Sequence, residues 1–283
     1  MSSPGPAHQS PTPTIGVFDS GFGGLTVLRA LVARAPQARF AFLGDSARLP
    51  YGSKSRRTIA RYAAQSARFL VEEQGADYLV IACNTASALA LDAIQEAVSV
   101  PVLGVIEPGA EAARRASKTG DVLVIATDAT VQSHAYAAAC RAHGLRALEK
   151  ACPLLVPLVE EGWTSHPVTA QVFRIYFDEL TLEAASLGLH PDTLVLGCTH
   201  YPLLKPLIEQ AIPAGMTAID SAESAADKLV MYLCRDLAAP PPPPYPETVL
   251  RCFATDSVEK FERLGSRFLG HPVGKVQLVD LGG

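Results

Sequence analysis

Short apolar runs alternate with segments of helical periodicity along most of the chain. The apolar runs lie at 15–18, 40–43, 78–82, 102–105, 122–126 and 193–197. Apolar residues recur at helical spacing at 25–34, 58–73, 86–98, 131–143, 168–187 and 203–212. The runs are continuous rather than alternating in polarity, as expected for strands that are covered on both faces. The pattern predicts an α/β fold with mostly parallel sheet, in which ligands bind at the carboxyl ends of the strands.

One arrangement occurs twice in the same order. The first strand ends on Asp19 and is followed 64 residues later by Cys83, which directly follows another apolar run. In the second half, a strand that ends near Asp128 is followed 70 residues later by Cys198. Chance similarity between buried strands is the alternative explanation. We interpret the repeat as two related α/β units that face each other.

Length and charge limit the classes of function. With 283 residues the chain is long enough for two domains, and 48% hydrophobic residues can form a core. The net charge of −4 gives no electrostatic basis for binding nucleic acid or an anionic membrane. No run of about 18 apolar residues is present, so we expect no membrane span. The Pro/Ser-rich residues 1–14 are predicted to be a disordered tail, and the Pro-rich residues 240–246 a connector.

The cysteines point to a reduced, cytoplasmic protein. None of the six forms a C-x-x-C pair, so neither a disulfide scaffold nor a thiolate metal site is expected. Cys83 and Cys198 each follow a strand and precede a helix. The partial positive charge at a helix N-terminus is expected to favour the thiolate and lower its pKa. A small buried hydrophobe explains either cysteine alone, but the matched pair favours a function.

Other polar residues lie beside these strand ends. The segment DSGFGG at 19–24 offers backbone N–H groups to an anion, although Asp19 also suits an ordinary turn. The loop at 44–55 is either a surface loop or a ligand-binding one, with the Tyr51 hydroxyl and the Gly52 N–H as contacts. His200 follows the second cysteine closely. Glu160 ends an apolar segment and is otherwise an ordinary solvated glutamate.

Seven motifs in this order resemble the bacterial glutamate racemase family. They are IGVFDSGFGGLTVLRAL, GDSARLPYGSKS, VIACNTASA, PVLGVIEPGA, VIATDATVQSHAY, VPLVEEG and VLGCTHYPLLKP. The resemblance runs from Ile15 to at least Asp227, and FATDSVEKFERLG near the end fits it too. A racemase of a related amino acid, such as aspartate, is the alternative within the same superfamily.

The resemblance implies two pseudo-symmetric α/β domains with the active site in the cleft between them. We expect the first domain to comprise 15–105 and 218–283, and the second 106–217. The family needs neither pyridoxal phosphate nor a metal, binds glutamate as a small-molecule substrate, commonly forms homodimers, and supplies D-glutamate for peptidoglycan in the cytoplasm.

The resemblance also assigns residues. It makes Cys83 and Cys198 the catalytic pair, acting on D-glutamate and L-glutamate respectively, with Asp19, Glu160 and His200 assisting proton transfer. The implied substrate contacts are Asp19, Ser20, Tyr51, Gly52, Asn84, Thr85, Thr199 and His200.

The chemistry explains why two cysteines are needed. Inverting a stereocentre by deprotonation requires one base on each face of the α-carbon, and a thiol changes protonation state close enough to neutrality to serve as either acid or base.

Two other classes of function compete with this one. A thiol hydrolase or redox protein would use one cysteine with His200 and leave the other idle. A non-catalytic module would only bind an amino acid.

Overall fold

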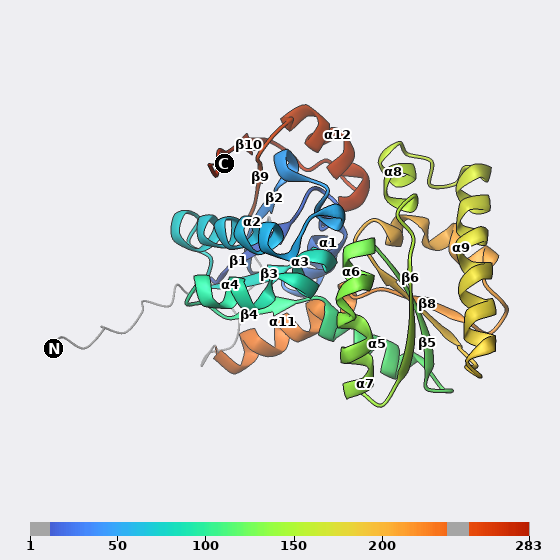
Figure 1. Cartoon of the computed structure of the whole chain (residues 1–283). Helices are drawn as coiled ribbons and strands as arrows, with labels where there is room; N and C mark the ends of the chain where they lie inside the picture. The colour runs from blue at the N-terminus through green and yellow to red at the C-terminus, as the bar shows by residue number, and fades with distance from the viewer. Residues whose placement is uncertain (1–11, 237–248, 283) are drawn as a thin grey trace.

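A computed structural model describes residues 12–236 and 249–282 (Figure 1). The Pro-rich connector and most of the predicted tail lie outside these residues. The tail prediction extends too far at its C-terminal end, because Thr14 already begins a strand. Among the described residues, no helix is long and apolar enough to cross a bilayer.

The strands form two wholly parallel sheets, which confirms the predicted fold class. The six-stranded sheet has the order β10-β9-β2-β1-β3-β4, and the four-stranded sheet has the order β6-β5-β7-β8. The first contains β1 (Thr14–Asp19), β2 (Arg39–Gly44), β3 (Tyr78–Ile81), β4 (Val102–Gly104), β9 (Leu250–Ala254) and β10 (Val276–Leu278). The second contains β5 (Asp121–Ala126), β6 (Arg146–Ala151), β7 (Thr193–Gly197) and β8 (Thr217–Ile219).

The two sheets repeat one topology. The order β2-β1-β3-β4 in the first matches β6-β5-β7-β8 in the second, so β1 is equivalent to β5 and β3 to β7. The first sheet is extended at one edge by β9 and β10, which come from the end of the chain. The repeat seen in the sequence therefore corresponds to equivalent strands.

Helices cover both faces of the sheets (Figure 1). The first unit contains α1 (Leu25–Arg34), α2 (Arg56–Arg68) with its π-helical extension (Phe69–Glu73), α3 (Asn84–Leu89), α4 (Leu91–Ala97), α11 (Ala222–Asp236) and α12 (Val258–Leu269). The second contains α5 (Ile106–Ala116), α6 (Asp128–Ser133), α7 (Ala135–Ala142), α8 (Leu155–Glu160), α9 (Pro167–Ser186) and α10 (Lys205–Ala211). Short 3-10 helices lie at Ser46–Arg48, Tyr51–Ser53 and Tyr201–Leu204.

Burial on both faces explains the continuous apolar strands. Val17 of β1 packs in one apolar cluster with Leu28 of α1, whereas its neighbour Phe18 packs in another with Ile59 of α2. Successive side chains of a strand point to opposite faces, so both must be apolar when both faces are covered.

One of the predicted domain boundaries falls inside a strand. The predicted boundary between residues 217 and 218 cuts β8, which pairs with β7 in the four-stranded sheet. The chain therefore returns to the first unit after Ile219, with α11, which packs against α1. We propose that the first unit comprises 15–105 and 220–282, and the second 106–219.

Candidate active site

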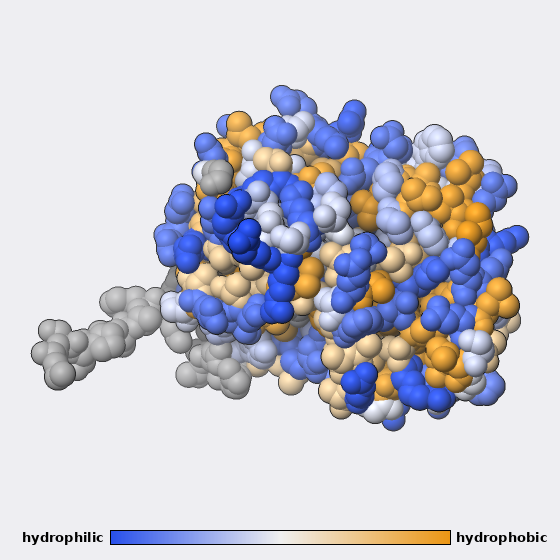
Figure 2. All heavy atoms as spheres, viewed as in Figure 1, coloured by the Kyte–Doolittle hydropathy of each residue, from blue (hydrophilic) through white to orange (hydrophobic). Residues whose placement is uncertain are grey.

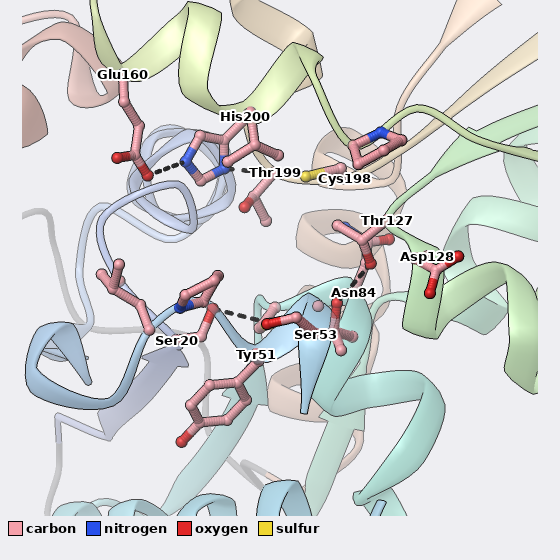
Figure 3. A pocket seen from close by; sticks show the side chains of 18 of the residues that line it. Ser20, Tyr51, Ser53, Asn84, Thr127, Asp128, Glu160, Cys198, Thr199 and His200 are labelled. Atoms are coloured by element: carbon pink, nitrogen blue, oxygen red, sulfur yellow. Dashed lines mark hydrogen bonds and ion pairs between the residues drawn. The ribbon is translucent and has the colours of Figure 1, made fainter. Parts of the chain in front are cut away.

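A cavity of about 250 Å³ lies between the two units, at the carboxyl ends of β1, β3, β5 and β7 (Figure 3). Its size suits a small metabolite rather than a polymer. The wall includes ten of the predicted site residues: Ser20, Tyr51, Gly52, Cys83, Asn84, Thr85, Glu160, Cys198, Thr199 and His200. Asp19 is not part of the wall. It lies just behind it, and only 1% of its surface is exposed.

Cys83 occupies the N-cap position of α3, immediately after β3. Its Sγ accepts a hydrogen bond from the Ala86 N–H at 3.4 Å and donates to Ser20 Oγ at 3.4 Å. Burial and the nearby carboxylate of Asp19 nevertheless raise the pKa of the Cys83 thiol to about 12. The expectation that the helix N-terminus lowers this pKa is wrong for Cys83, because desolvation outweighs the hydrogen bond from the Ala86 N–H at the start of α3.

Cys198 begins a chain of polar contacts on the opposite side of the cavity. His200 Nδ1 lies 3.9 Å from Cys198 Sγ, and His200 Nε2 lies 3.3 Å from Glu160 Oε1 (Figure 3). Burial lowers the pKa of His200, but the contacts with Cys198 and Glu160 outweigh burial and raise this pKa to about 10. Burial also raises the pKa of Glu160, while His200 and then Lys260 more than offset this and lower it. At neutral pH, His200 is therefore an imidazolium beside the second sulfur.

This charge predicts a pH dependence of stability. Because the folded-state pKa of His200 is raised, its contribution is complete below the unfolded pKa of about 6.5 and is lost as pH rises through about 10. We expect the free energy of unfolding of the wild-type protein to fall more steeply between pH 7 and 10 than that of His200→Asn, measured by urea denaturation. Parallel pH profiles for the two proteins would contradict an imidazolium at this position.

Gly23 allows the two units to approach closely, and Gly24 allows the start of α1 to lie close to the end of β1. A Cβ atom on Gly23 would lie 2.3 Å from Thr199 Oγ1 and 2.7 Å from His200 Nδ1, and one on Gly24 would lie 2.6 Å from the Asp19 Cβ. No side chain fits at either position. The glycines of DSGFGG therefore bring the start of α1 against the loop that carries the second cysteine, where Thr26 Oγ1 donates to the Thr199 carbonyl at 3.2 Å.

The Tyr51 hydroxyl does not face the cavity, contrary to prediction. The hydroxyl points away from the cavity (Figure 3) and donates a hydrogen bond to Asp45 Oδ2 at 2.5 Å. Asp45 is fully buried and also accepts bonds from Arg48 Nε and from Thr255 Oγ1, at 2.8 and 2.9 Å. Tyr51 lines the cavity, while its hydroxyl is linked through Asp45 to Thr255, the residue that follows strand β9.

Hydroxyl groups join the units at the rim. Thr85 Oγ1 lies 2.9 Å from Thr127 Oγ1 and 3.2 Å from Thr130 Oγ1, and Tyr136 donates to Asn84 Oδ1 at 2.7 Å. Thr127 and Asp128 line the cavity but were not among the predicted site residues. The repeated arrangement in the sequence could have identified both residues. They directly follow β5, just as Ser20 directly follows β1, the equivalent strand of the first sheet. The other wall residues not predicted are Gly21, Phe22, Leu49, Pro50, Ser53, Pro153, Val156 and Pro157.

One group among the described residues has metal-ligand geometry: Glu107, Glu111 and His143. It is outside the cavity wall. His143 Nε2 lies 2.7 Å from Glu107, and Glu111 is paired with Lys228. These side chains already pair with one another or with Lys228.

A family model for Asp/Glu/hydantoin racemases matches residues 15–229, a span that includes all of the cavity wall. The chain belongs to this racemase family. A glutamate racemase of Koribacter versatilis (strain Ellin345) is 53% identical over 290 residues, covering 96% of this chain and 98% of its own. The match therefore extends over nearly the whole of both chains.

Solved racemase structures share the whole fold. Glutamate racemase RacE1 of Bacillus anthracis matches with a TM-score of 0.85 and 36% identity, covering 96% of this racemase and 99% of its own chain. The glutamate racemase of Francisella tularensis subsp. tularensis SCHU S4, solved in complex with D-glutamate, matches with a TM-score of 0.83 and 34% identity over 96% and 99% of the two chains.

Proposed function

We propose that this chain interconverts L-glutamate and D-glutamate without a cofactor, using Cys83 and Cys198 as the two bases. We further propose that it acts in the cytoplasm as a homodimer and supplies D-glutamate for peptidoglycan. The names of the relatives support the substrate. The observation that carries the mechanism is that two cysteines, each at the end of an equivalent strand, line one cavity.

The paired arrangement suits inversion. One thiolate removes the α-proton while a thiol on the opposite face donates one, and the roles exchange in the reverse direction. Equivalent positions in two facing units provide such a pair. A hydrolase or redox reaction at Cys198 with His200 would leave Cys83 and its contact with Ser20 without a role.

The two cysteines differ in their electrostatic surroundings. The high pKa of Cys83 keeps it a neutral thiol, which can donate a proton. The imidazolium of His200 places a positive charge beside Cys198, with Nδ1 3.9 Å from the sulfur. We infer that Cys83 serves as the acid when Cys198 serves as the base, the direction that the family's assignment gives to L-glutamate. Glu160 holds His200 in place, and Asp19 acts from behind Cys83.

Stabilising the carbanion is the larger task, since an α-proton of an amino acid is far less acidic than a thiol. Hydroxyl and amide groups of Ser20, Asn84, Thr85 and Thr199 surround the cavity and can bind the substrate carboxylates. In a water-poor cavity such preorganised donors are worth more than in water. Gly52 leaves its backbone accessible, and a Cβ added at this position would lie 3.0 Å from the Thr127 Cβ.

A deuterium experiment tests this function. We expect purified protein, incubated with L-glutamate in D2O without added cofactor, to lose the optical activity of the substrate and to place deuterium on the α-carbon. L-aspartate under the same conditions should change at least tenfold more slowly. Faster reaction of aspartate would establish the sister activity instead, and an unchanged glutamate sample would leave only a binding module or a hydrolase.

A further inference from the structure

A buried tyrosine of the second unit reaches a wall residue of the first. Tyr136, on α7, is fully buried, and its hydroxyl donates a hydrogen bond to Asn84 Oδ1 of α3 at 2.7 Å. Asn84 lines the cavity and is only 3% exposed. The bond therefore joins the interior of one unit to a side chain that a molecule in the cavity can contact.

This bond determines which end of the Asn84 carboxamide remains available. An amide oxygen only accepts hydrogen bonds, and an amide nitrogen only donates them. Because Tyr136 occupies Oδ1, the polar atom left for the cavity is Nδ2, which has no hydrogen-bond partner within residues 12–236 and 249–282. Burial raises the pKa of the Tyr136 hydroxyl, so this group stays protonated and remains a donor. An amide group that presents N–H bonds suits a carboxylate of an amino acid rather than its ammonium group.

Two glycines form a slot for the Tyr136 ring. A Cβ atom on Gly109 of α5 would lie 2.9 Å from Cε1 of the ring and 3.0 Å from its hydroxyl oxygen, and one on Gly197 of β7 would lie 3.0 Å from Cε2. Gly197 directly precedes Cys198. The backbone of the second unit thus encloses both edges of the ring, and this close packing fixes the direction of the hydroxyl.

The opposite side of the cavity has a matching arrangement. Thr26 Oγ1 donates to the backbone carbonyl of Thr199 at 3.2 Å. Asn84 and Thr199 directly follow Cys83 and Cys198, and each accepts a hydrogen bond from a hydroxyl of the other unit. The two hydroxyls come from equivalent connections, one between β1 and β2 and the other between β5 and β6. Each unit therefore holds the residue that follows the cysteine of the other.

The bond to Asn84 crosses the junction between the units. Figure 2 shows side chains of the two units meeting across this junction on one face of the molecule. In the interior, Tyr136 packs in one apolar cluster with Ile106 and Val195 of its own unit. Because the core of the second unit carries the hydroxyl, the orientation of Asn84 in the first unit depends on the two units being in contact.

We propose that Tyr136 is a positioning residue, which holds the Asn84 carboxamide with its NH2 group toward the cavity, where it binds a carboxylate of the substrate. The inference rests on the proposed function and deepens it, since it names a residue of the second unit on which a substrate contact of the first depends. Tyr136 is not part of the cavity wall, so it acts through Asn84 and does not touch the substrate.

A double-mutant cycle tests this role. Calorimetry measures the dissociation constant for racemic glutamate, because racemisation cannot change the composition of a racemic mixture. We expect Tyr136→Phe, which removes only the hydroxyl, to raise this constant roughly fivefold, as for the loss of one neutral hydrogen bond. Asn84→Ala is expected to raise it by about tenfold or more, because a bond to a charged group is lost. In the Asn84→Ala background, Tyr136→Phe should change the constant by less than about twofold, since the two residues act as one unit.

An unchanged dissociation constant in Tyr136→Phe overturns the proposal. So does an equal increase in the presence and absence of the Asn84 carboxamide, because Tyr136 would then act on the fold and not through Asn84. Gly109→Ala provides a second variant, which keeps both side chains but places a methyl group against the ring and hydroxyl of Tyr136. It should also raise the constant in the wild-type background and not in Asn84→Ala, and any other pattern contradicts the proposal. Chemical denaturation establishes that each variant is folded.

Tyr176→Phe is the matched control. It removes the hydroxyl of another tyrosine in the second unit, which accepts a hydrogen bond from the Leu154 N–H and is outside the cavity wall. The dissociation constant for glutamate should stay within about twofold of the wild-type value.

Racemisation by the wild type is followed separately by circular dichroism. A wild type that binds glutamate with the expected coupling but does not racemise it would overturn the proposed activity and keep the role of Tyr136. A wild type that racemises glutamate without coupling between the two residues would keep the activity and overturn the role of Tyr136.

Discussion

Cys83→Ser and Cys198→Ser are each expected to lose racemisation of glutamate by roughly 10³-fold or more in kcat/KM, because a serine hydroxyl is too weak an acid and base to replace a thiol. The two sulfurs line the same cavity from equivalent strand ends. The loss is measured by circular dichroism of the amino acid in both directions. A variant with one remaining base can exchange the α-proton of one enantiomer for deuterium but cannot invert it.

A matched control separates catalysis from folding. Cys140 is fully buried in the second unit but is not part of the cavity wall. Cys140→Ser should therefore keep racemase activity at temperatures where the variant remains folded. Activity near the wild-type level in either Cys83→Ser or Cys198→Ser would refute the two-base mechanism.

Asp45→Ala is expected to lower the free energy of unfolding by about 3 to 5 kcal/mol, because it leaves the Arg48 guanidinium and the Tyr51 hydroxyl without their buried partner. Arg48 is only 11% exposed, so water cannot fully replace the carboxylate. Chemical denaturation at neutral pH measures this loss. The variant should also raise KM for glutamate more than it lowers kcat, since Asp45 positions the Tyr51–Gly52 loop and does not touch the cavity.

A conservative variant tests the positioning role. Tyr51→Phe removes only the hydroxyl that is bonded to Asp45, so it should raise KM in the same sense with a smaller loss of stability. If KM is unchanged in both variants while stability falls, Asp45 supports the fold alone. If the unfolding free energy of Asp45→Ala is also unchanged, the buried network has no energetic role.

The buried elements were predictable because their patterns are local. All six predicted strands form, and α1 spans the predicted residues 25–34. The strands that were missed lack such a pattern. The edge strand β6 has the charged sequence RALEKA and is half-buried, and β9 has an arginine within its sequence LRCFA. The strands β8 and β10 have three residues each. Their positions depend on neighbouring strands rather than on their own apolar residues.

Helix interruptions were less predictable than helices. The segment predicted as one helix at 86–98 divides at Ala90, and that at 131–143 divides at His134, which has φ of 54°. A left-handed histidine carries no clear sequence signal, since only glycine adopts this conformation readily.

The cavity wall was predictable in outline, because parallel strands bring their ends together. The direction in which individual side chains point could not be predicted from the sequence. The Tyr51 hydroxyl binds Asp45, whose partners Arg48 and Thr255 are far apart in the sequence. The pKa of the Cys83 thiol is set mainly by desolvation, which depends on the whole surrounding fold rather than on the position of the residue at the start of a helix.

The hydroxyl contacts between Thr85, Thr127 and Thr130 have a consequence for access to the cavity. A hydrogen bond between neutral groups contributes only about 1 kcal/mol net, so these bonds hold the units shut weakly. We expect a separation of the units that breaks these bonds to cost little free energy. Thr85 and Thr127 line the cavity, so their hydroxyls are placed to exchange a bond between the units for a bond to a molecule in the cavity. Access to the cavity and binding inside it would then use the same side chains.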